Sequence, residues 1–288
     1  MSRLALYILM VFAMVAWGET WISAKILNRY LDAKELIFWR FLFTTIGLVP
    51  IILVAKKSFK ISMYNIAIVL ISAILLSLYN GAFFLGTKYG LASIGGVLVT
   101  TLNPIITFFI ISIIKKKRFS KIEAIGLVIG VIGALIMLEI WYFKLDLIFS
   151  KGNIYYLIAS FLWPFLTIIS SKQKDINPMI FSFYLFLFTS VFSLIWSGHI
   201  SNILEFDSIF WINLLLLSLF GTTFATTIYF LAVTKLGSKI ASSFFFLVPS
   251  SAIIFAIIFL GEKISLALIV GGVLSILAVY IINLGAKN

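Results

Sequence analysis

The feature that most constrains this chain is a succession of apolar runs of about 20 residues, separated by short stretches that carry the charges. A helix of that length spans the roughly 30 Å hydrocarbon core of a bilayer, whereas the strands of a membrane barrel alternate in segments of about 10 residues. Of the 288 residues, 62% are hydrophobic and 11% are charged, a balance that no water-soluble core accommodates. The sequence therefore predicts an all-α membrane protein.

Ten apolar runs are predicted to be transmembrane helices, and the loops between them are too short to hold a domain outside the membrane. Their approximate bounds are Leu4–Ala24, Leu36–Ala55, Ile66–Thr87, Ser93–Ile114, Ile122–Leu138, Ile154–Ser171, Pro178–Trp196, Ile209–Thr234, Ile240–Leu260 and Ile264–Leu284. The side of the membrane that holds both termini carries fourteen Lys and Arg residues in its loops, and the other side carries seven. By the positive-inside rule, both termini are predicted to be cytoplasmic.

Composition also narrows the partners that we expect. The chain has no cysteine and one histidine, His199, in a short loop, so we expect neither a metal site nor a cofactor. The net charge is +12, but the basic residues fall between apolar runs and not on one exposed face, which favours contact with membrane lipid over nucleic acid. The oligomeric state is left open between monomer and homodimer.

Two halves of the sequence match each other at a nearly constant offset. Pro104 corresponds to Pro249 at 145 residues, and Trp17 corresponds to Trp163 at 146. Other rare matches lie close to the same register: Ser120 with Ser265, Gly126 with Gly271, and Thr87–Gly90 with Thr234–Gly237. We therefore predict two tandem five-helix repeats, residues 1–146 and 147–288. Because five is odd, the second repeat enters the membrane from the opposite side, which makes the repeats inverted, as in many secondary transporters.

Several motifs, in this order and spacing, resemble the EamA family of the drug/metabolite transporter superfamily. They are AWG at residues 16–18, FWRFLF around Arg40, the prolines of the predicted fourth and ninth helices, and LGEKIS at residues 260–265. The resemblance covers nearly the whole chain and implies a transporter of the bacterial inner membrane, whose relatives mostly export amino acids or small metabolites. The sequence departs from the family pattern at residues 116–117, where two lysines replace a Gly-Glu pair.

Glu19 is the most conspicuous candidate for a functional residue, because it lies about 15 residues into the first span, where an unpaired carboxylate is costly. One interpretation makes Glu19 a site for a proton or for a substrate ammonium group. The other is a structural ion pair with Arg40 of the second span, or with Lys25, and one pair can also serve both purposes.

Other polar and aromatic residues deep within the spans are predicted to line a substrate cavity: Trp17, Arg40, Tyr79, Asn80, Phe83, Asn103, Trp163, Thr226, Tyr229 and Ser242. Asn80 and Thr226 occupy repeat-related positions, which favours a shared cavity, although hydrogen bonding between helices explains each of them equally well. Three prolines inside spans predict helix bends, which act either as hinges of a transport path or as static kinks: Pro104, Pro164 and Pro249.

Taken together, these features predict a secondary active transporter that exports an amino acid or a related small metabolite by alternating access. No nucleotide-binding G-x-x-x-x-G-K-[ST] motif occurs, so proton coupling through Glu19 is the simplest source of energy. One alternative is a multidrug or organic-cation exporter. Another is a membrane-embedded lipid-modifying enzyme, which the scatter of the ten acidic residues disfavours, so we expect a protein that is not an enzyme.

Overall fold

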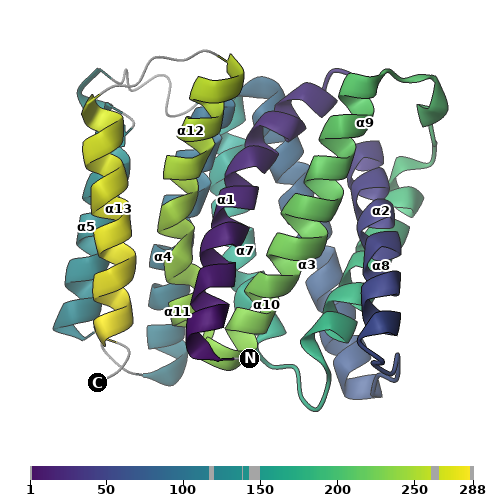
Figure 1. Ribbon diagram of the computed structural model, residues 1–288, viewed down its shortest axis with the longest axis horizontal. Helices are drawn as coiled ribbons and strands as arrows, with labels where there is room; N and C mark the ends of the chain where they lie inside the picture. The colour runs from purple at the N-terminus through teal and green to yellow at the C-terminus, as the bar shows by residue number, and fades with distance from the viewer. Residues whose placement is uncertain (1, 117–119, 138, 143–149, 261–265, 286–288) are drawn as a thin grey trace.

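The computed structural model describes residues 2–116, 120–137, 139–142, 150–260 and 266–285 (Figure 1). Within these ranges every regular element is helical, as the sequence predicts. Part of the LGEKIS motif, residues 261–265, lies outside the described residues, and so does Lys117 of the lysine pair that departs from the family pattern.

The first half of the chain forms five helices. They are α1 (Arg3–Leu27), α2 (Ala33–Val54), α3 (Met63–Tyr89), α4 (Ala92–Lys115) and α5 (Lys121–Met137), followed by the short 3-10 turn η1 (Ile140–Tyr142). The second half begins with α7 (Lys151–Ser170), α8 (Pro178–Ser197) and the 3-10 turn η2 (Ile203–Glu205).

The remaining helical segments of the second half change geometry along their length. One segment consists of α9 (Ser208–Leu215), the π-helix η3 (Leu216–Phe224) and α10 (Ala225–Leu236). The next consists of α11 (Ser238–Ser243), the 3-10 turn η4 (Phe244–Leu247) and α12 (Val248–Leu260), and the last helix is α13 (Leu266–Gly285). The sequence predicts single apolar spans at both interrupted segments, so the irregular turns are new information from the structure.

Among the described residues, eight helical segments are long and apolar enough to cross a membrane. Two of them are the continuous segments Ser208–Leu236 and Ser238–Phe259. The two remaining predicted spans correspond to α5, which has 17 residues, and to α13. The all-helical fold is confirmed, whereas the count of ten spans and the inverted repeat stay predictions.

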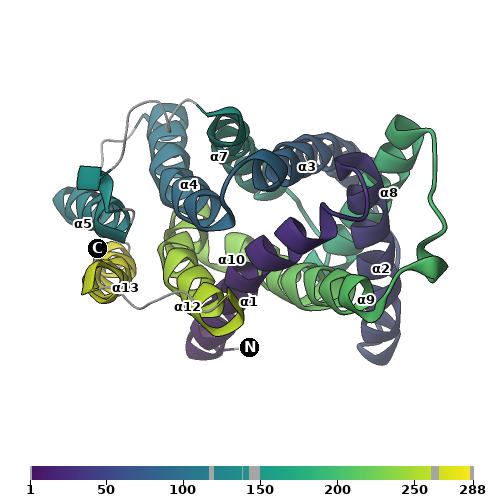
Figure 2. The same cartoon turned by 90° about the horizontal axis from the view of Figure 1, so that it is seen from above.

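The helices pack in a reciprocal pattern around the middle of the bundle. Viewed from above, α1 runs near the centre, α5 and α13 form a pair at one edge, and α2 and α8 lie at the other (Figure 2). Two sets of contacts join the halves. Helices α3 and α4 of the first half pack on α7, and helices α10 and α12 of the second half pack on α1. The first helix of each half thus packs on the third-span and fourth-span helices of the other half.

Small residues let the backbones of α5 and α13 approach closely. A Cβ atom on Gly133 would lie 2.9 Å from the carbonyl oxygen of Gly271, and one on Gly126 would lie 3.2 Å from the backbone nitrogen of Ile282. Real Cβ atoms essentially never come as close as 2.9 Å to another heavy atom, so Gly133 leaves no room for a side chain. The glycines therefore stabilise contacts within this one chain.

The three predicted helix bends differ in the structure. At Pro249 the chain changes from the 3-10 turn η4 to α12, so the helix is irregular directly before this proline. By contrast, α4 stays helical on both sides of Pro104 and α7 on both sides of Pro164. A bend at these two prolines stays a prediction.

Hydrogen-bonded side chains fix the loop ends at the membrane edge. Asp207, the N-cap of α9, accepts hydrogen bonds from the backbone nitrogen of Phe210 at 3.0 Å and from the hydroxyl of Tyr30 at 2.8 Å. Both bonds lower the pKa of the Asp207 carboxyl below its ordinary value, and the bond from Phe210 has the larger effect. The contact attaches the loop between α1 and α2 to the start of α9.

We expect Gly18→Ala to destabilise the protein by about 1–3 kcal/mol, because the added methyl group overpacks the contact between α1 and α12. A Cβ on Gly18 would lie 2.6 Å from the backbone nitrogen of Ala252, where no flexible side chain can move aside. Equilibrium unfolding in detergent measures the effect.

Gly96→Ala is the matched control, because it faces the same neighbour with more room: its Cβ would lie 3.4 Å from the Cβ of Ala252. We expect this variant to unfold as the parent does. Equal loss of stability in both variants would contradict the assignment of close packing to Gly18.

A candidate substrate cavity between the two halves

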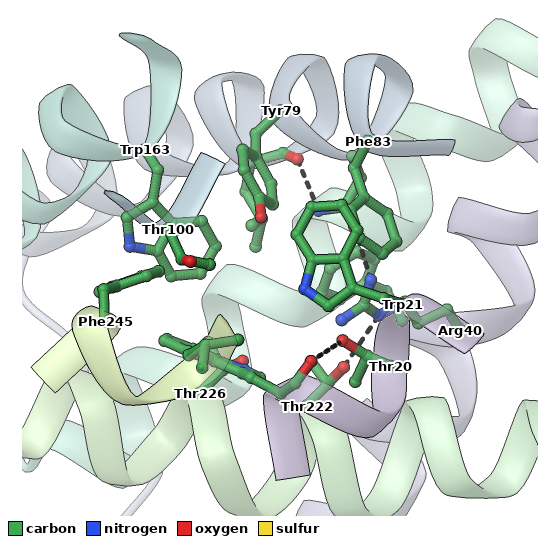
Figure 3. Close-up of a pocket in the computed structure, with 15 residues that line it drawn as sticks. Thr20, Trp21, Arg40, Tyr79, Phe83, Thr100, Trp163, Thr222, Thr226 and Phe245 are labelled. Carbon is green, nitrogen blue, oxygen red and sulfur yellow. Dashed lines mark hydrogen bonds between the residues drawn. The ribbon is translucent and has the colours of Figure 1, made fainter. Parts of the chain in front are cut away.

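Side chains from both halves of the chain enclose a cavity near the middle of the bundle (Figure 3). The space between the lining residues that is free of protein atoms is about 460 Å³, a volume that includes open solvent. Its lining consists of Trp17, Thr20, Trp21, Arg40, Phe41, Leu76, Tyr79, Asn80, Phe83, Thr100, Trp163, Thr222, Thr226, Phe245 and Val248.

Most of the residues predicted from the sequence meet in this cavity. Those that line it are Trp17, Arg40, Tyr79, Asn80, Phe83, Trp163 and Thr226. Four predicted residues are not among the lining residues in this conformation: Glu19, Asn103, Tyr229 and Ser242. Asn103 is fully buried in α4, and neither polar atom of its amide has a hydrogen-bond partner among the described residues. The hydroxyl of Ser242 donates to the carbonyl of Lys239.

The core of the cavity wall is a cluster of aromatic rings from both halves. Trp17 of α1 and Trp163 of α7, which the predicted repeat relates, contact each other edge to face with ring centroids 5.2 Å apart. Tyr79 lies 4.6 Å from Trp163, and Phe245 lies 4.8 Å from Trp17. Tyr229 lies behind them, 5.2 Å from Trp17. Rings in such edge-on and tilted contacts form a rigid apolar surface.

The π-helix η3 forms another part of the wall. Its wider turn leaves backbone carbonyls available, and side-chain donors occupy them. The hydroxyl of Thr222 donates to the carbonyl of Leu217 at 2.8 Å, and the indole nitrogen of Trp17 donates to that of Gly221 at 2.9 Å. The π-helix is therefore tied to α1 and turns Thr222 towards the cavity.

Arg40 is a buried cation of α2 that two other elements of the fold, α3 and η3, hold in place. Its Nε donates to the hydroxyl of Thr222 at 2.8 Å, and its Nη1 donates to the amide oxygen of Asn80 at 2.8 Å. The guanidinium also lies over the ring of Phe83, 5.7 Å from the centroid. All of these partners are neutral, so the positive charge has no carboxylate in direct contact.

Glu19 does not form the ion pair that one interpretation of the sequence proposes. Among the described residues, neither Arg40 nor Lys25 lies within ion-pair distance of its carboxylate. The ammonium group of Lys25 instead donates to the carbonyl oxygens of Thr87 and Gly90, at 2.7 and 2.8 Å, and so binds the C-terminal end of α3. A purely structural Glu19 ion pair with either residue is therefore wrong for this conformation.

The surroundings of Glu19 suit a protonated carboxyl group. Its side chain is 6% exposed, contacts the hydroxyl of Ser23 through Oε1, and has no partner for Oε2 within the described part of the chain. Ser23 has one hydroxyl proton but also lies 3.0 Å from the amide oxygen of Asn213, whose Nδ2 already donates to Ile209. Both contacts are hydrogen bonds when Ser23 donates its proton to Asn213 and a protonated Glu19 donates to Ser23.

The structure adds eight lining residues that the sequence predictions did not include: Thr20, Trp21, Phe41, Leu76, Thr100, Thr222, Phe245 and Val248. Helical spacing gives a signal for some of them, because Trp21 lies four residues after Trp17 and Thr222 lies four residues before Thr226. No such signal marks Phe245, which the 3-10 turn η4 places against Trp17.

A second, larger hollow opens at the ends of α4, α7 and α10, with an empty volume of about 1860 Å³ that includes open solvent. Its lining includes an ion pair between Lys239 of α11 and Glu123 of α5, with Nζ 2.9 Å from Oε1. Glu123 also forms a reciprocal cap with Ser120: each side chain accepts from the backbone nitrogen of the other residue. The pair thus joins α5 to α11 at one end of the bundle.

Comparison with known proteins agrees with the resemblance seen in the sequence. The sequence pattern of the EamA-like transporter family matches twice, at residues 4–139 and 150–284. The uncharacterized transporter YyaM of Bacillus subtilis (strain 168) is 24% identical over 289 residues, which cover 97% of this chain and 93% of that protein. An uncharacterized transporter of Archaeoglobus fulgidus is 25% identical over 286 residues, with 96% of each chain covered.

A solved crystal structure of another protein has the same fold. It matches with a TM-score of 0.77 and 14% sequence identity over 99% of each chain. At this identity the likeness concerns the fold alone.

Substitution of Glu123 separates its two structural roles. Glu123→Gln keeps a side chain that can cap α5 but removes the charge that faces Lys239, whereas Glu123→Ala removes both. We expect both variants to be destabilised, Glu123→Ala by about 1 kcal/mol more, which is the typical contribution of a helix cap. Equilibrium unfolding in detergent measures the difference, and indistinguishable variants would mean that the cap contributes nothing.

Proposed function

Because this chain belongs to the EamA-like transporter family, we propose that it carries a small organic solute across a membrane by secondary active transport. It is a multi-pass membrane protein, and both its family and its transporter-named relatives point to a transporter rather than an enzyme. The solute, the mechanism and the coupling ion that follow are our proposals.

The observation that carries the proposal is the central cavity, because both halves of the chain contribute to its wall. Trp17 and Trp163 face each other there, and Asn80 and Thr226 line it from repeat-related positions. A site between two similar halves suits alternating access, in which the halves exchange conformations and open the site to one side at a time. The two family matches, at residues 4–139 and 150–284, support repeats with a boundary near residue 146.

We propose Glu19 as the proton site that drives transport. The contacts of Ser23 are satisfied when Glu19 carries a proton, and Oε2 of Glu19 has no protein partner among the described residues. Deprotonation would leave a buried carboxylate without an ion-pair partner, which costs free energy in a membrane and favours a change of conformation. A proton at this position is thus linked to the packing of α1 against α9, where Asn213 lies.

The cargo that fits the proposal is an amino acid or a related small metabolite, moved outward across a bacterial inner membrane with both termini in the cytoplasm. The basic loops on the side of the termini support this orientation. An organic-cation exporter is the weaker alternative, since the cavity carries the guanidinium of Arg40 and no acidic side chain among its described lining residues.

We expect Glu19→Gln to lower solute flux about tenfold or more and to remove its dependence on a pH gradient, since the amide can neither bind nor release the proton. The measurement is counterflow and pH-driven uptake in proteoliposomes, with a panel of amino acids and related metabolites and with the internal pH recorded.

Glu35→Gln is the matched control. Glu35 is equally buried, 6% exposed, but it accepts a hydrogen bond from the backbone nitrogen of Ser201 in a loop and does not line the cavity. We expect this variant to keep both flux and pH dependence. If Glu19→Gln transports with an unchanged pH profile, the proton-coupling proposal is wrong. If the parent protein moves no member of the panel, transport of this class of solute is wrong.

A further inference from the structure

We propose that the cavity recognises its cargo by a carboxylate, which Arg40, Tyr79 and Trp21 bind while the aromatic cluster holds an apolar body. The inference rests on the proposed transport function and specifies the substrate class. It makes the carboxylate of an amino acid or related metabolite the essential group, and the ammonium group dispensable.

Three unpaired hydrogen-bond donors in the cavity carry this inference. Arg40 uses Nε and Nη1 for protein contacts, and within the described residues no group accepts from its Nη2, from the hydroxyl of Tyr79 or from the indole nitrogen of Trp21. All three donor atoms keep some accessible surface, because none of them belongs to the fully buried polar atoms without a partner. Figure 3 shows Arg40 and Trp21 on one side of the space, Trp163 on the other, and Tyr79 between them.

The charges around the cavity favour an anion. The described lining contains one guanidinium and no Asp or Glu. The carboxylate of Glu19 lies beyond ion-pair distance of that guanidinium. A carboxylate accepts hydrogen bonds only, so it suits a set of donors, and its bond to a guanidinium is stronger than a bond between neutral groups. At the same position an ammonium group would instead meet three donors, one of which carries a like charge.

Packing does not require an arginine at this position. The segment Phe41–Thr44 has the sequence FLFT, and FLFT recurs 145 residues later at Phe186–Thr189. The same offset, 40 plus 145, brings Arg40 to Leu185, which is fully buried and apolar. At the corresponding position of the second half, the fold therefore accommodates a leucine. Packing alone does not explain the charge of Arg40.

The apolar body has a surface to rest on opposite the guanidinium. Trp163 contacts Tyr79, Trp17 and Phe245, and all four rings line the cavity. Each ring is held by its neighbours, so little conformational entropy is lost when a solute packs on them. A carboxylate at Arg40 and an apolar group on these rings together define one orientation of the cargo.

The test removes one charged group of a ligand at a time. The probes are L-phenylalanine, 3-phenylpropionate, which lacks the ammonium group, phenethylamine, which lacks the carboxylate, and 3-phenylpropionamide, which has no charge. Quenching of intrinsic tryptophan fluorescence in detergent reports binding, because Trp17, Trp21 and Trp163 all line the cavity. We expect the two carboxylates to bind and to be transported, and to bind at least about tenfold more tightly than the amine and the amide.

Variants assign this preference to the named donors. We expect Tyr79→Phe and Arg40→Gln to weaken binding of 3-phenylpropionate, Arg40→Gln by about tenfold or more, and to leave binding of the amide within about twofold. Tyr229→Phe is the matched control, because the hydroxyl of Tyr229 contacts Thr167 at 2.8 Å and does not line the cavity. Gel filtration and thermal unfolding verify that each variant is folded.

Three outcomes overturn the inference. They are an amine that binds as tightly as the carboxylates, equal losses for carboxylate and amide in Arg40→Gln, and no binding of any probe. If another solute of the transport panel still moves in proteoliposomes, the proposed transporter function survives and only the carboxylate inference fails. If nothing moves, the proposed function itself fails.

Discussion

A guanidinium buried inside a membrane-spanning bundle must find, within the protein, the partners that water would otherwise supply. Arg40 finds them on two other elements, because Asn80 of α3 and Thr222 of η3 accept its hydrogen bonds and the ring of Phe83 covers one face. The same contacts therefore hold α2, α3 and η3 around one point. The cavity is open next to this point, so its position follows from the solvation of one side chain.

The π-helix makes this arrangement possible. An α-helix would bond each carbonyl to the amide four residues on, whereas η3 has carbonyls that side chains occupy from outside and from within the segment. Trp17 donates to Gly221, Thr44 donates to Ser218, and Thr222 donates to Leu217 while it accepts from Arg40. An irregular backbone in a membrane is stable only when such donors satisfy it, so η3 depends on α1 and α2 as much as they depend on it.

The polar chemistry of the site is divided unequally between the halves. Both buried ionisable side chains near the centre, Glu19 and Arg40, belong to the first half, and they lie in separate places: Arg40 lines the cavity, whereas Glu19 contacts Ser23 beside it. The second half contributes aromatic rings and hydroxyl groups, among them Trp163 and Thr222. Both halves of the chain thus form the framework, and both of these ionisable side chains come from the first half.

The sequence by itself determines that this is a helical membrane protein. A continuous apolar run of about 20 residues spans the bilayer as a helix, which satisfies its backbone hydrogen bonds internally. It also indicates that Trp17, Trp163, Asn80 and Thr226 belong to one cavity, since rare residues at a repeat offset stand out in an apolar chain. The tertiary structure alone decides which way each helix faces. A helix in lipid is apolar on every side, so the periodicity that orients a helix in a soluble protein is weak, and Glu19 gives no sign that it turns away from the cavity while Trp17 and Trp21 turn towards it. Rotation, the π turn of η3 and the separation of Glu19 from Arg40 come from packing between helices, which depends on side chains far apart in the chain.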